Sequence, residues 1–116
     1  MTPVIDFDAM QTQLGGDEEL IGEVIAIFLE DYPARLQAID AAIQRANAAD
    51  IRAAAHALKG GASNLCAASV VKQAGALESA AASGDVVSSS DRFNALSAEV
   101  ERLAQLLREF QTRRPH

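Results

Sequence analysis

Apolar side chains recur at steps of three and four residues through most of this chain, and this spacing constrains the fold more than any other feature. Residues at that spacing lie on one face of an α-helix. The longest run, from residue 17 to about residue 47, keeps its phase through Pro33, so we predict one kinked helix there rather than two helices. Its apolar positions are Ile21, Val24, Ile25, Phe28, Tyr32, Leu36, Ile39 and Ile43.

The same spacing predicts four further helices, a short one near the N-terminus and three longer ones. They cover residues 7–14, about 50–65, 70–81 and 93–110. The connections between the long helices are short, which places consecutive helices side by side and antiparallel. We therefore expect an all-α fold, an antiparallel up-and-down four-helix bundle with a short extra N-terminal helix.

The composition agrees with closely packed helices. Apolar residues make up 49% of the 116 residues, whereas aromatic residues make up 4% and tryptophan is absent. Alanine and leucine therefore form most of the core, and a β-sandwich would need more β-branched and aromatic side chains. A chain of this length suits one domain. We expect a single domain over residues 1–116, with the bundle core at about 17–112, and enough helices for a monomer.

Charge and motif content exclude several classes of function. The net charge is −6 and the basic cluster at Arg113-Arg114 is small, so we expect no binding to nucleic acid. No apolar run approaches the roughly 18 residues of a membrane span. No nucleotide-binding loop and no metal-ligand spacing is present, so the chain should have no ATP site, metal or cofactor of its own. The one cysteine, Cys66, cannot form an internal disulfide and fits a cytoplasmic protein.

The segment around His56 is the strongest candidate for a functional site. His56 lies roughly 140° around the helix from Ile51 and roughly 160° from Leu58, two members of the apolar face. It should therefore point to solvent. Lys59 and Gly60 follow one turn later, on the same side as the histidine. Glycine costs about 1 kcal/mol relative to alanine inside a helix, and a glycine pair is accepted where another group approaches the backbone closely.

An exposed imidazole with these neighbours suits phosphoryl transfer. A neutral imidazole is a good nucleophile, and its reference pKa of about 6.5 leaves it mostly neutral near pH 7. Phosphoryl transfer needs positioning and neutralising cations more than covalent chemistry from the protein. Lys59 is placed to supply one positive charge, and Gly60 leaves room for the visiting group.

The run His56-Ala57-Leu58-Lys59-Gly60, followed by Ala62-Ser63-Asn64-Leu65 and Ala67, resembles the signature of histidine-containing phosphotransfer (HPt) domains. The order and length of the helices extend the resemblance from about residue 6 to about residue 112. It implies that His56 accepts a phosphoryl group from a receiver-domain aspartate in a phosphorelay and passes it to another receiver. It also implies supporting roles for Lys59 and Gly60.

The resemblance implies partners as well. These would be response-regulator receiver domains, and a hybrid sensor histidine kinase is a further candidate. The receiver would bring the Mg²⁺ and most of the catalytic groups, which leaves this chain a phosphocarrier without its own ATP site. Small residues around the histidine, Ala57, Gly61 and Ser63, would let the active site of the receiver close over it.

Two positions depart from the family pattern. Gly61 stands where a serine or alanine is common, which loosens the helix but leaves the site open. Cys66 stands where a glycine normally ends the helix in a left-handed conformation, which cysteine adopts less easily. We therefore expect a differently built helix end, or backbone strain, near Cys66, whose side chain should be a small buried apolar group.

Two other functions remain open at this point. The phosphoacceptor segment of a sensor kinase also places a histidine on a bundle helix, but it resembles a motif with an acidic residue directly after the histidine, where this chain has Ala57. A helical adaptor bundle without chemistry at His56 is the second alternative. Modification of the histidine by a phosphoryl donor distinguishes the adaptor from the carrier.

Overall fold

The computed structural model describes residues 4–113 and consists of five helices joined by short connections. The helices are α1 (Phe7–Gln13), α2 (Glu18–Gln44), α3 (Ala48–Asn64), α4 (Ala68–Ala82) and α5 (Ser89–Arg113). No strand occurs within residues 4–113, so the prediction of an all-helical fold is confirmed. Arg114, which belongs to the basic cluster Arg113-Arg114, lies outside the described residues.

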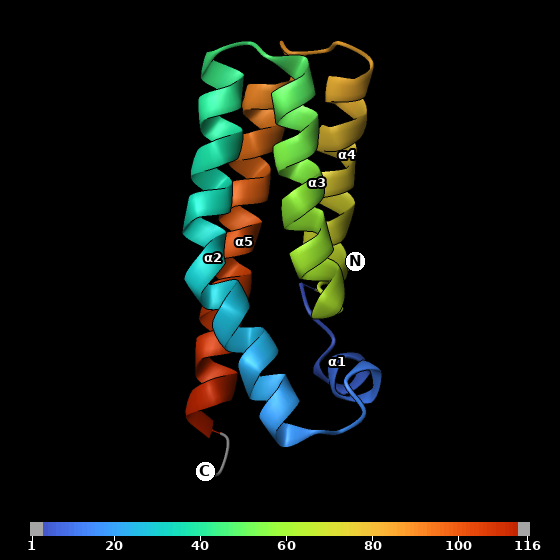
Figure 1. The fold of residues 1–116 in the computed structure, drawn as a ribbon, viewed down its shortest axis with the longest axis vertical. Coiled ribbons are helices and arrows are strands. Elements are labelled where there is room, and N and C mark those ends of the chain that lie inside the picture. Colours follow the sequence, from blue (N-terminus) through green and yellow to red (C-terminus); the bar gives the residue numbers. More distant parts are fainter. Residues whose placement is uncertain (1–3, 114–116) are drawn as a thin grey trace.

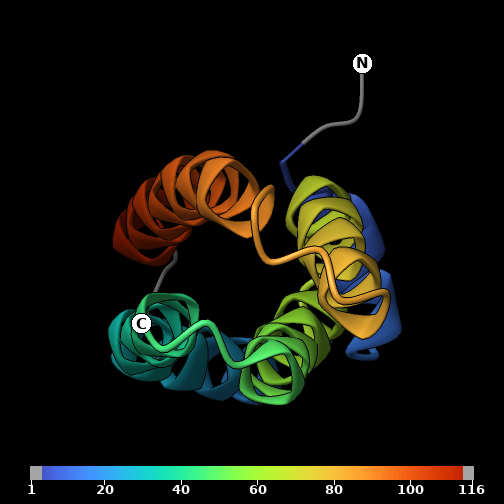
Figure 2. The same cartoon turned by 90° about the horizontal axis from the view of Figure 1, so that it is seen from above.

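The four long helices lie side by side around a common core. Along the chain, α2 and α4 run in one direction and α3 and α5 run in the other (Figure 1). Each long helix contacts its two neighbours, and α2 and α5 close the ring, as the view along the helices shows (Figure 2). The fully buried side chains include Met10, Ile21, Ile25, Ile39, Ile51, Leu58, Leu65, Val70, Leu77, Leu96, Leu103 and Leu107.

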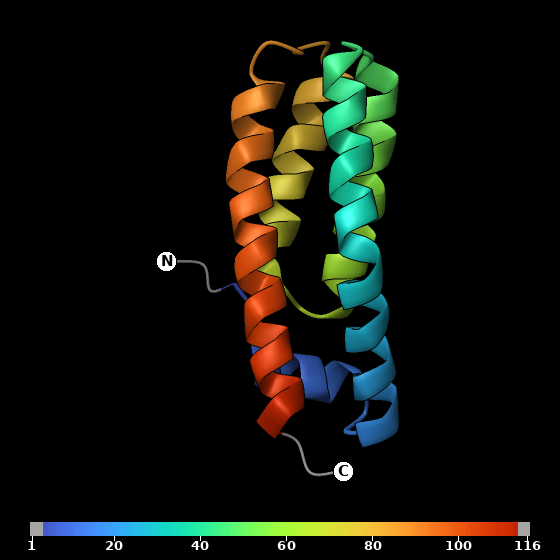
Figure 3. The same ribbon diagram turned by 90° about the vertical axis from the view of Figure 1, so that its left-hand side faces the viewer.

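The short helix α1 lies across one end of the bundle, beneath the ends of α3 and α4 and between the longer α2 and α5 (Figure 3). The Phe7 ring of α1 stacks on the Phe110 ring of α5, with ring centroids 4.7 Å apart. Met10 of α1 is fully buried. The N-terminal helix therefore contributes to the core and covers the end of the bundle that the shorter helices leave open.

Side-chain caps set the starts of the first three helices. The carboxylate of Asp6 accepts a hydrogen bond from the Ala9 N–H, and Asp17 caps α2 in the same way. For α3, the Asn47 side chain accepts from the Asp50 N–H at 3.0 Å. The histidine helix consequently begins at Ala48, earlier than the predicted start near residue 50, because asparagine is a strong N-cap.

The predicted passage of α2 through Pro33 is confirmed, since one helix runs on both sides of the proline. Its direction changes along its length (Figure 1), as expected where a proline removes one backbone hydrogen bond. The helix ends at Gln44 rather than near residue 47. Ala46 adopts a φ of 53°, which stops the helix before the next one begins.

Candidate functional site

His56 lies in the middle of α3 and points away from the core. Ala55 and Leu58, its neighbours on the apolar face, are 0% and 1% exposed, whereas the His56 side chain is 68% exposed. The division of the helix into a buried face and a solvent face follows the periodicity of the sequence, and the imidazole is accessible to a partner.

Glu78 of α4 joins His56 and Lys59 in one cluster. One carboxylate oxygen lies 2.6 Å from His56 Nδ1, and the other accepts a hydrogen bond from Lys59 Nζ at 2.5 Å. The Glu78 side chain is 17% exposed and that of Lys59 is 30% exposed. An ionised carboxylate only accepts hydrogen bonds, so the ring nitrogen that faces it carries the hydrogen. In the neutral ring, the lone pair then belongs to Nε2.

The protonation state of Glu78 in this cluster depends mainly on Lys59. The Lys59 ammonium, which donates to Glu78, lowers the pKa of that carboxyl below its ordinary value of 4.5. The hydrogen bond with His56 acts in the same direction and burial acts against it. Glu78 is therefore an anion near neutral pH, and Lys59 is held by it rather than extended freely beside the histidine.

Sequence reasoning missed Glu78, although one signal could have found it. In an antiparallel pair of helices, residues at equal distances from the connection lie opposite each other, because both helices rise by the same amount per residue. His56 and Glu78 are each eleven residues from Ala67, and Lys59 and Gly75 are each eight residues from it. A Cβ atom on Gly75 would lie 3.8 Å from Lys59 Cδ, in agreement with this register.

The two glycines after Lys59 face different surroundings. A Cβ atom on Gly60 would meet no atom within 4 Å, whereas one on Gly61 would lie 3.6 Å from Cδ1 of Phe28 in α2. Gly60 is exposed. It therefore leaves open space one turn after the histidine, and Gly61 allows α2 and α3 to pack closely.

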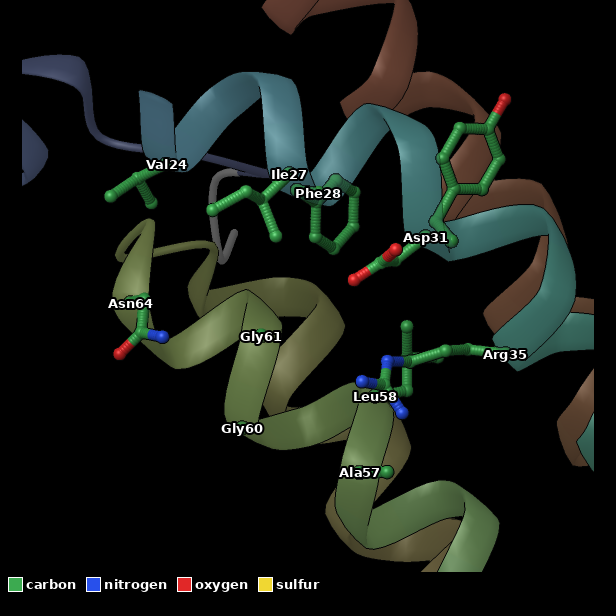
Figure 4. Close-up of a pocket in the computed structure, with 11 residues that line it drawn as sticks. Val24, Ile27, Phe28, Asp31, Arg35, Ala57, Leu58, Gly60, Gly61 and Asn64 are labelled. Carbon is green, nitrogen blue, oxygen red and sulfur yellow. The ribbon is translucent and has the colours of Figure 1, made fainter. Parts of the chain in front are cut away.

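A groove of about 320 Å³ runs between α2 and α3 (Figure 4), and Ala57, the residue that follows His56, lines it. Its α2 wall carries Ile27, which is 59% exposed, and Asp31 and Arg35 lie toward one end of it (Figure 4). The remaining lining residues are Val24, Phe28, Tyr32, Leu58, Gly60, Gly61 and Asn64.

The three residues predicted to surround a docked partner do not all line this groove. Ala57 and Gly61 belong to it. Ser63 lies elsewhere on α3, exposed, and its hydroxyl donates to the Lys59 carbonyl at 2.9 Å. The structure thus brings Ala57, Gly60 and Gly61 together with apolar residues of α2. Val24 and Phe28 belong to the predicted apolar stripe, whereas Ile27 lies outside it.

The end of α3 is strained at Cys66, which has a φ of 55°. The Ala67 N–H donates to the Ala62 carbonyl, so the chain turns as it would with glycine there. Gln13 of α1 donates to the carbonyls of Ser63 and Asn64. The prediction that Cys66 is a small buried apolar group is wrong, because the thiol is half-buried and its sulfur donates to Gln13 at 3.2 Å.

Two further features concern the whole described chain. Within residues 4–113, no group of three or more His, Cys, Asp or Glu side chains is arranged to hold a metal ion. No helix in that range combines the length and the apolar character that crossing a membrane requires.

Comparisons with known proteins agree on one family. The sequence model of the Hpt domain matches residues 23–106, which includes His56, Lys59 and Glu78. The crystal structure of histidine-containing phosphotransfer protein B (HptB) from Pseudomonas aeruginosa PAO1 superposes with a TM-score of 0.90 at 23% sequence identity, over 99% of this chain and 100% of that one. A search of curated proteins finds no match.

Proposed function

Because this chain belongs to the Hpt domain family, a family of histidine phosphotransfer domains that work with receiver domains in phosphorelay signalling, we propose that His56 is its phosphoacceptor. The observation that carries the proposal is the exposed His56 ring, whose Nδ1 lies 2.6 Å from the Glu78 carboxylate. A ring held in this way presents its second nitrogen to solvent as a nucleophile.

The proposed reaction starts with the Nδ1 hydrogen directed at Glu78 and a lone pair on Nε2. Attack forms an Nε2–P bond while the bond between phosphorus and the aspartyl oxygen of the receiver breaks, and the electron pair of that bond stays on the aspartate. The phosphorylated ring keeps its Nδ1 hydrogen and gains positive charge, which the adjacent Glu78 carboxylate stabilises. The reverse sequence transfers the group to a second receiver.

Lys59 and Gly60 support this step in different ways. Lys59 keeps Glu78 ionised and holds it in place through the 2.5 Å hydrogen bond. Gly60 has no side chain and faces open space, so the acidic active site of a receiver can approach the phosphoryl group. Mg²⁺ in this reaction belongs to the receiver, and the chain itself supplies no cofactor.

We propose that the receiver docks over the groove between α2 and α3, with Ala57 and Gly61 beneath it, and that Ser63 lies at the edge of the contact. Exposed Ile27 beside the groove supports this assignment, because an apolar patch next to a reactive side chain is typical of an interaction surface. A hybrid sensor histidine kinase is the source of phosphate that we propose for the relay.

The scaffold for this function is an antiparallel up-and-down four-helix bundle with a short extra N-terminal helix. The opposite directions of consecutive long helices support this description. We further propose that residues 1–116 form one domain, with its bundle core at about 17–112, that acts as a cytoplasmic monomer. The free thiol of Cys66 fits that compartment.

The test is incorporation of acid-labile phosphate. Receiver domains charged with acetyl phosphate and Mg²⁺ are mixed with the wild-type protein, and the label is mapped by peptide mass spectrometry. We expect the label on His56 and its onward transfer to an uncharged receiver. His56→Gln should fold as the wild type does and carry no label.

The matched control is His116→Gln, which removes the other histidine of the chain and should be labelled like the wild type. Equal labelling of His56→Gln and the wild type would refute the assignment. Failure of the wild type to take label from any receiver or from phosphoramidate would favour an adaptor without chemistry at His56.

A further inference from the structure

A second hollow lies on the opposite side of His56 from the groove. It has a volume of about 490 Å³ and is lined by Ala49, Arg52, Ala53, His56 and Glu78. Arg52 is exposed and precedes His56 by one helical turn, so the two side chains are neighbours on the surface of α3. The two alanines leave the space between the arginine and the imidazole uncrowded.

The charged side chains in and near this hollow differ in whether they have a partner of opposite charge. Both oxygens of Glu78 already have partners, one in His56 and the other in Lys59, and the charges of Lys59 and Glu78 cancel. Asp50, the acid nearest to Arg52 along α3, pairs with Arg45 at 3.2 Å. Among residues 4–113, none forms an ion pair with Arg52.

A phosphoryl group on His56 would therefore lie near Arg52, a cation that pairs with no acidic side chain of residues 4–113. The phosphoryl oxygens would together carry about −1.5 to −2 charge at neutral pH, next to a ring that gains positive charge. Because Nδ1 faces Glu78, the group lies on Nε2, away from the anion. Lys59 is neutralised by Glu78, and a guanidinium binds phosphate oxygens through two parallel hydrogen bonds.

We propose that Arg52 is a phosphoryl-binding residue that swings over the hollow and pairs with the phosphoryl group on His56. This inference rests on the proposed role of His56 as the phosphoacceptor. Arg52 then stabilises the phosphorylated form of the protein relative to the unmodified form, and so sets how strongly the carrier holds its phosphate against a receiver.

The experiment uses the full chain phosphorylated with phosphoramidate, a donor that needs no receiver. Phosphorus NMR follows the phosphohistidine signal through a pH titration, and exchange with a charged receiver gives the equilibrium constant of transfer. The variants are Arg52→Ala, Arg52→Lys and, as a control with the same change in charge, Arg102→Ala, which alters an exposed arginine on α5.

We expect Arg52→Ala to raise the pKa of the phosphoryl group, because a neighbouring cation favours the dianion. It should also shift the transfer equilibrium toward the receiver by about fivefold, the upper range for a partly exposed ion pair. Arg52→Lys should retain part of both effects, and Arg102→Ala should match the wild type. Circular dichroism before and after each titration verifies the fold.

The results that would overturn the inference are distinct from those that would overturn the phosphoacceptor assignment. If Arg52→Ala titrates and equilibrates like Arg102→Ala while His56 still carries phosphate, Arg52 has no such role and His56 keeps its own. The role of Arg52 is also refuted if Arg35→Ala, a change in the other groove, gives the larger shift of the phosphoryl pKa. A wild-type protein without phosphohistidine signal overturns both.

Discussion

The two sides of α3 differ in character, although both border the same histidine. Toward α4, the side chains are polar and paired, with Glu78 between His56 and Lys59. Toward α2, they are apolar or small, with Ile27 exposed and Gly61 facing Phe28. In the proposed function, the side facing α4 controls the reactivity of the imidazole and the side facing α2 binds the partner. Changes on the two sides should therefore alter different kinetic quantities.

The largest effect is expected at Gly60, where the two sides meet. Gly60→Glu places a long anion one turn after His56, and it should abolish transfer by bulk and by repulsion of both the phosphoryl group and the acids of the receiver. We expect the rate of label transfer from a charged receiver to fall at least about 100-fold.

Gly60→Ala is the matched control for this change. Its methyl group would meet no atom within 4 Å, and alanine favours a helix over glycine by about 1 kcal/mol. The variant should transfer phosphate at close to the wild-type rate and melt at a higher temperature. Normal transfer by Gly60→Glu would mean that the receiver does not approach this turn of the helix.

The next effect concerns the side facing α4. Glu78→Gln keeps the shape of the side chain but removes the charge that orients the His56 ring and pairs with Lys59. Hydrogen bonds to charged groups contribute about 1.5–3 kcal/mol, so we expect the maximal transfer rate to fall about 10- to 100-fold. Single-turnover kinetics at saturating receiver would measure this rate.

In the Glu78→Gln variant, the receiver concentration that gives half-maximal rate should stay unchanged. A rise in that concentration without a loss of maximal rate would assign Glu78 to docking and remove the distinction between the two sides. Glu99→Gln is a useful comparison, because Glu99 accepts a hydrogen bond from Ser69 and does not contact His56.

The opposite pattern is expected on the side facing α2. Ile27→Asp places a charge on an apolar surface that a docked receiver would bury, and it should raise the half-saturating receiver concentration about tenfold. The maximal rate should remain that of the wild type. Val87→Asp, which changes an apolar residue that is 92% exposed in the connection before α5, serves as the control.

If Ile27→Asp and Val87→Asp bind a receiver equally well, the groove is not the docking surface. Isothermal titration with an uncharged receiver would reveal this without any contribution from the chemical step. A loss of maximal rate in Ile27→Asp would instead mean that the two sides of α3 are not separate in function.

The sequence predicted one side of α3 better than the other for a physical reason. The exposure of His56 follows from its angle to Ile51 and Leu58, which is a property of one helix. The pairing with Glu78 depends on the register of two helices, and the carboxylate carries no local pattern that distinguishes it from other surface acids. The α2–α3 groove also requires tertiary structure, since Phe28 and Val24 belong to an apolar stripe whose spacing is typical of core residues.

The helix ends show the same limit. Asp6 and Asp17 cap α1 and α2, as acidic residues before a helical run predict. Ala46 and Cys66 adopt positive φ values, although neither is glycine. The family pattern, which has glycine at the position of Cys66, predicts strain there, whereas propensity gives no indication of the positive φ at Ala46. At Cys66, bonds from Gln13 hold the turn, and that residue is remote in sequence.

The smallest expected effect is on the free energy of unfolding. It arises from the Glu78 cluster on the side of α3 that faces α4. Lys59 lowers the pKa of Glu78 in the folded protein below its ordinary value of 4.5. The unfolded chain therefore binds more protons than the folded one as the pH falls through this range. The stabilising contribution of the cluster is complete above about pH 4.5 and is lost as the pH falls through the folded pKa.

Urea unfolding of the wild type and Glu78→Gln at several pH values measures this contribution as a difference in the free energy of unfolding. We expect the wild type to be the more stable near neutral pH and the difference to shrink in acid. Asp85→Asn should follow the same sign, because hydrogen bonds from Ser88 lower the pKa of Asp85. A Glu78 difference that is constant through acid pH would show that the cluster does not stabilise the folded protein through charge, and that Glu78 acts only on the reactivity of His56.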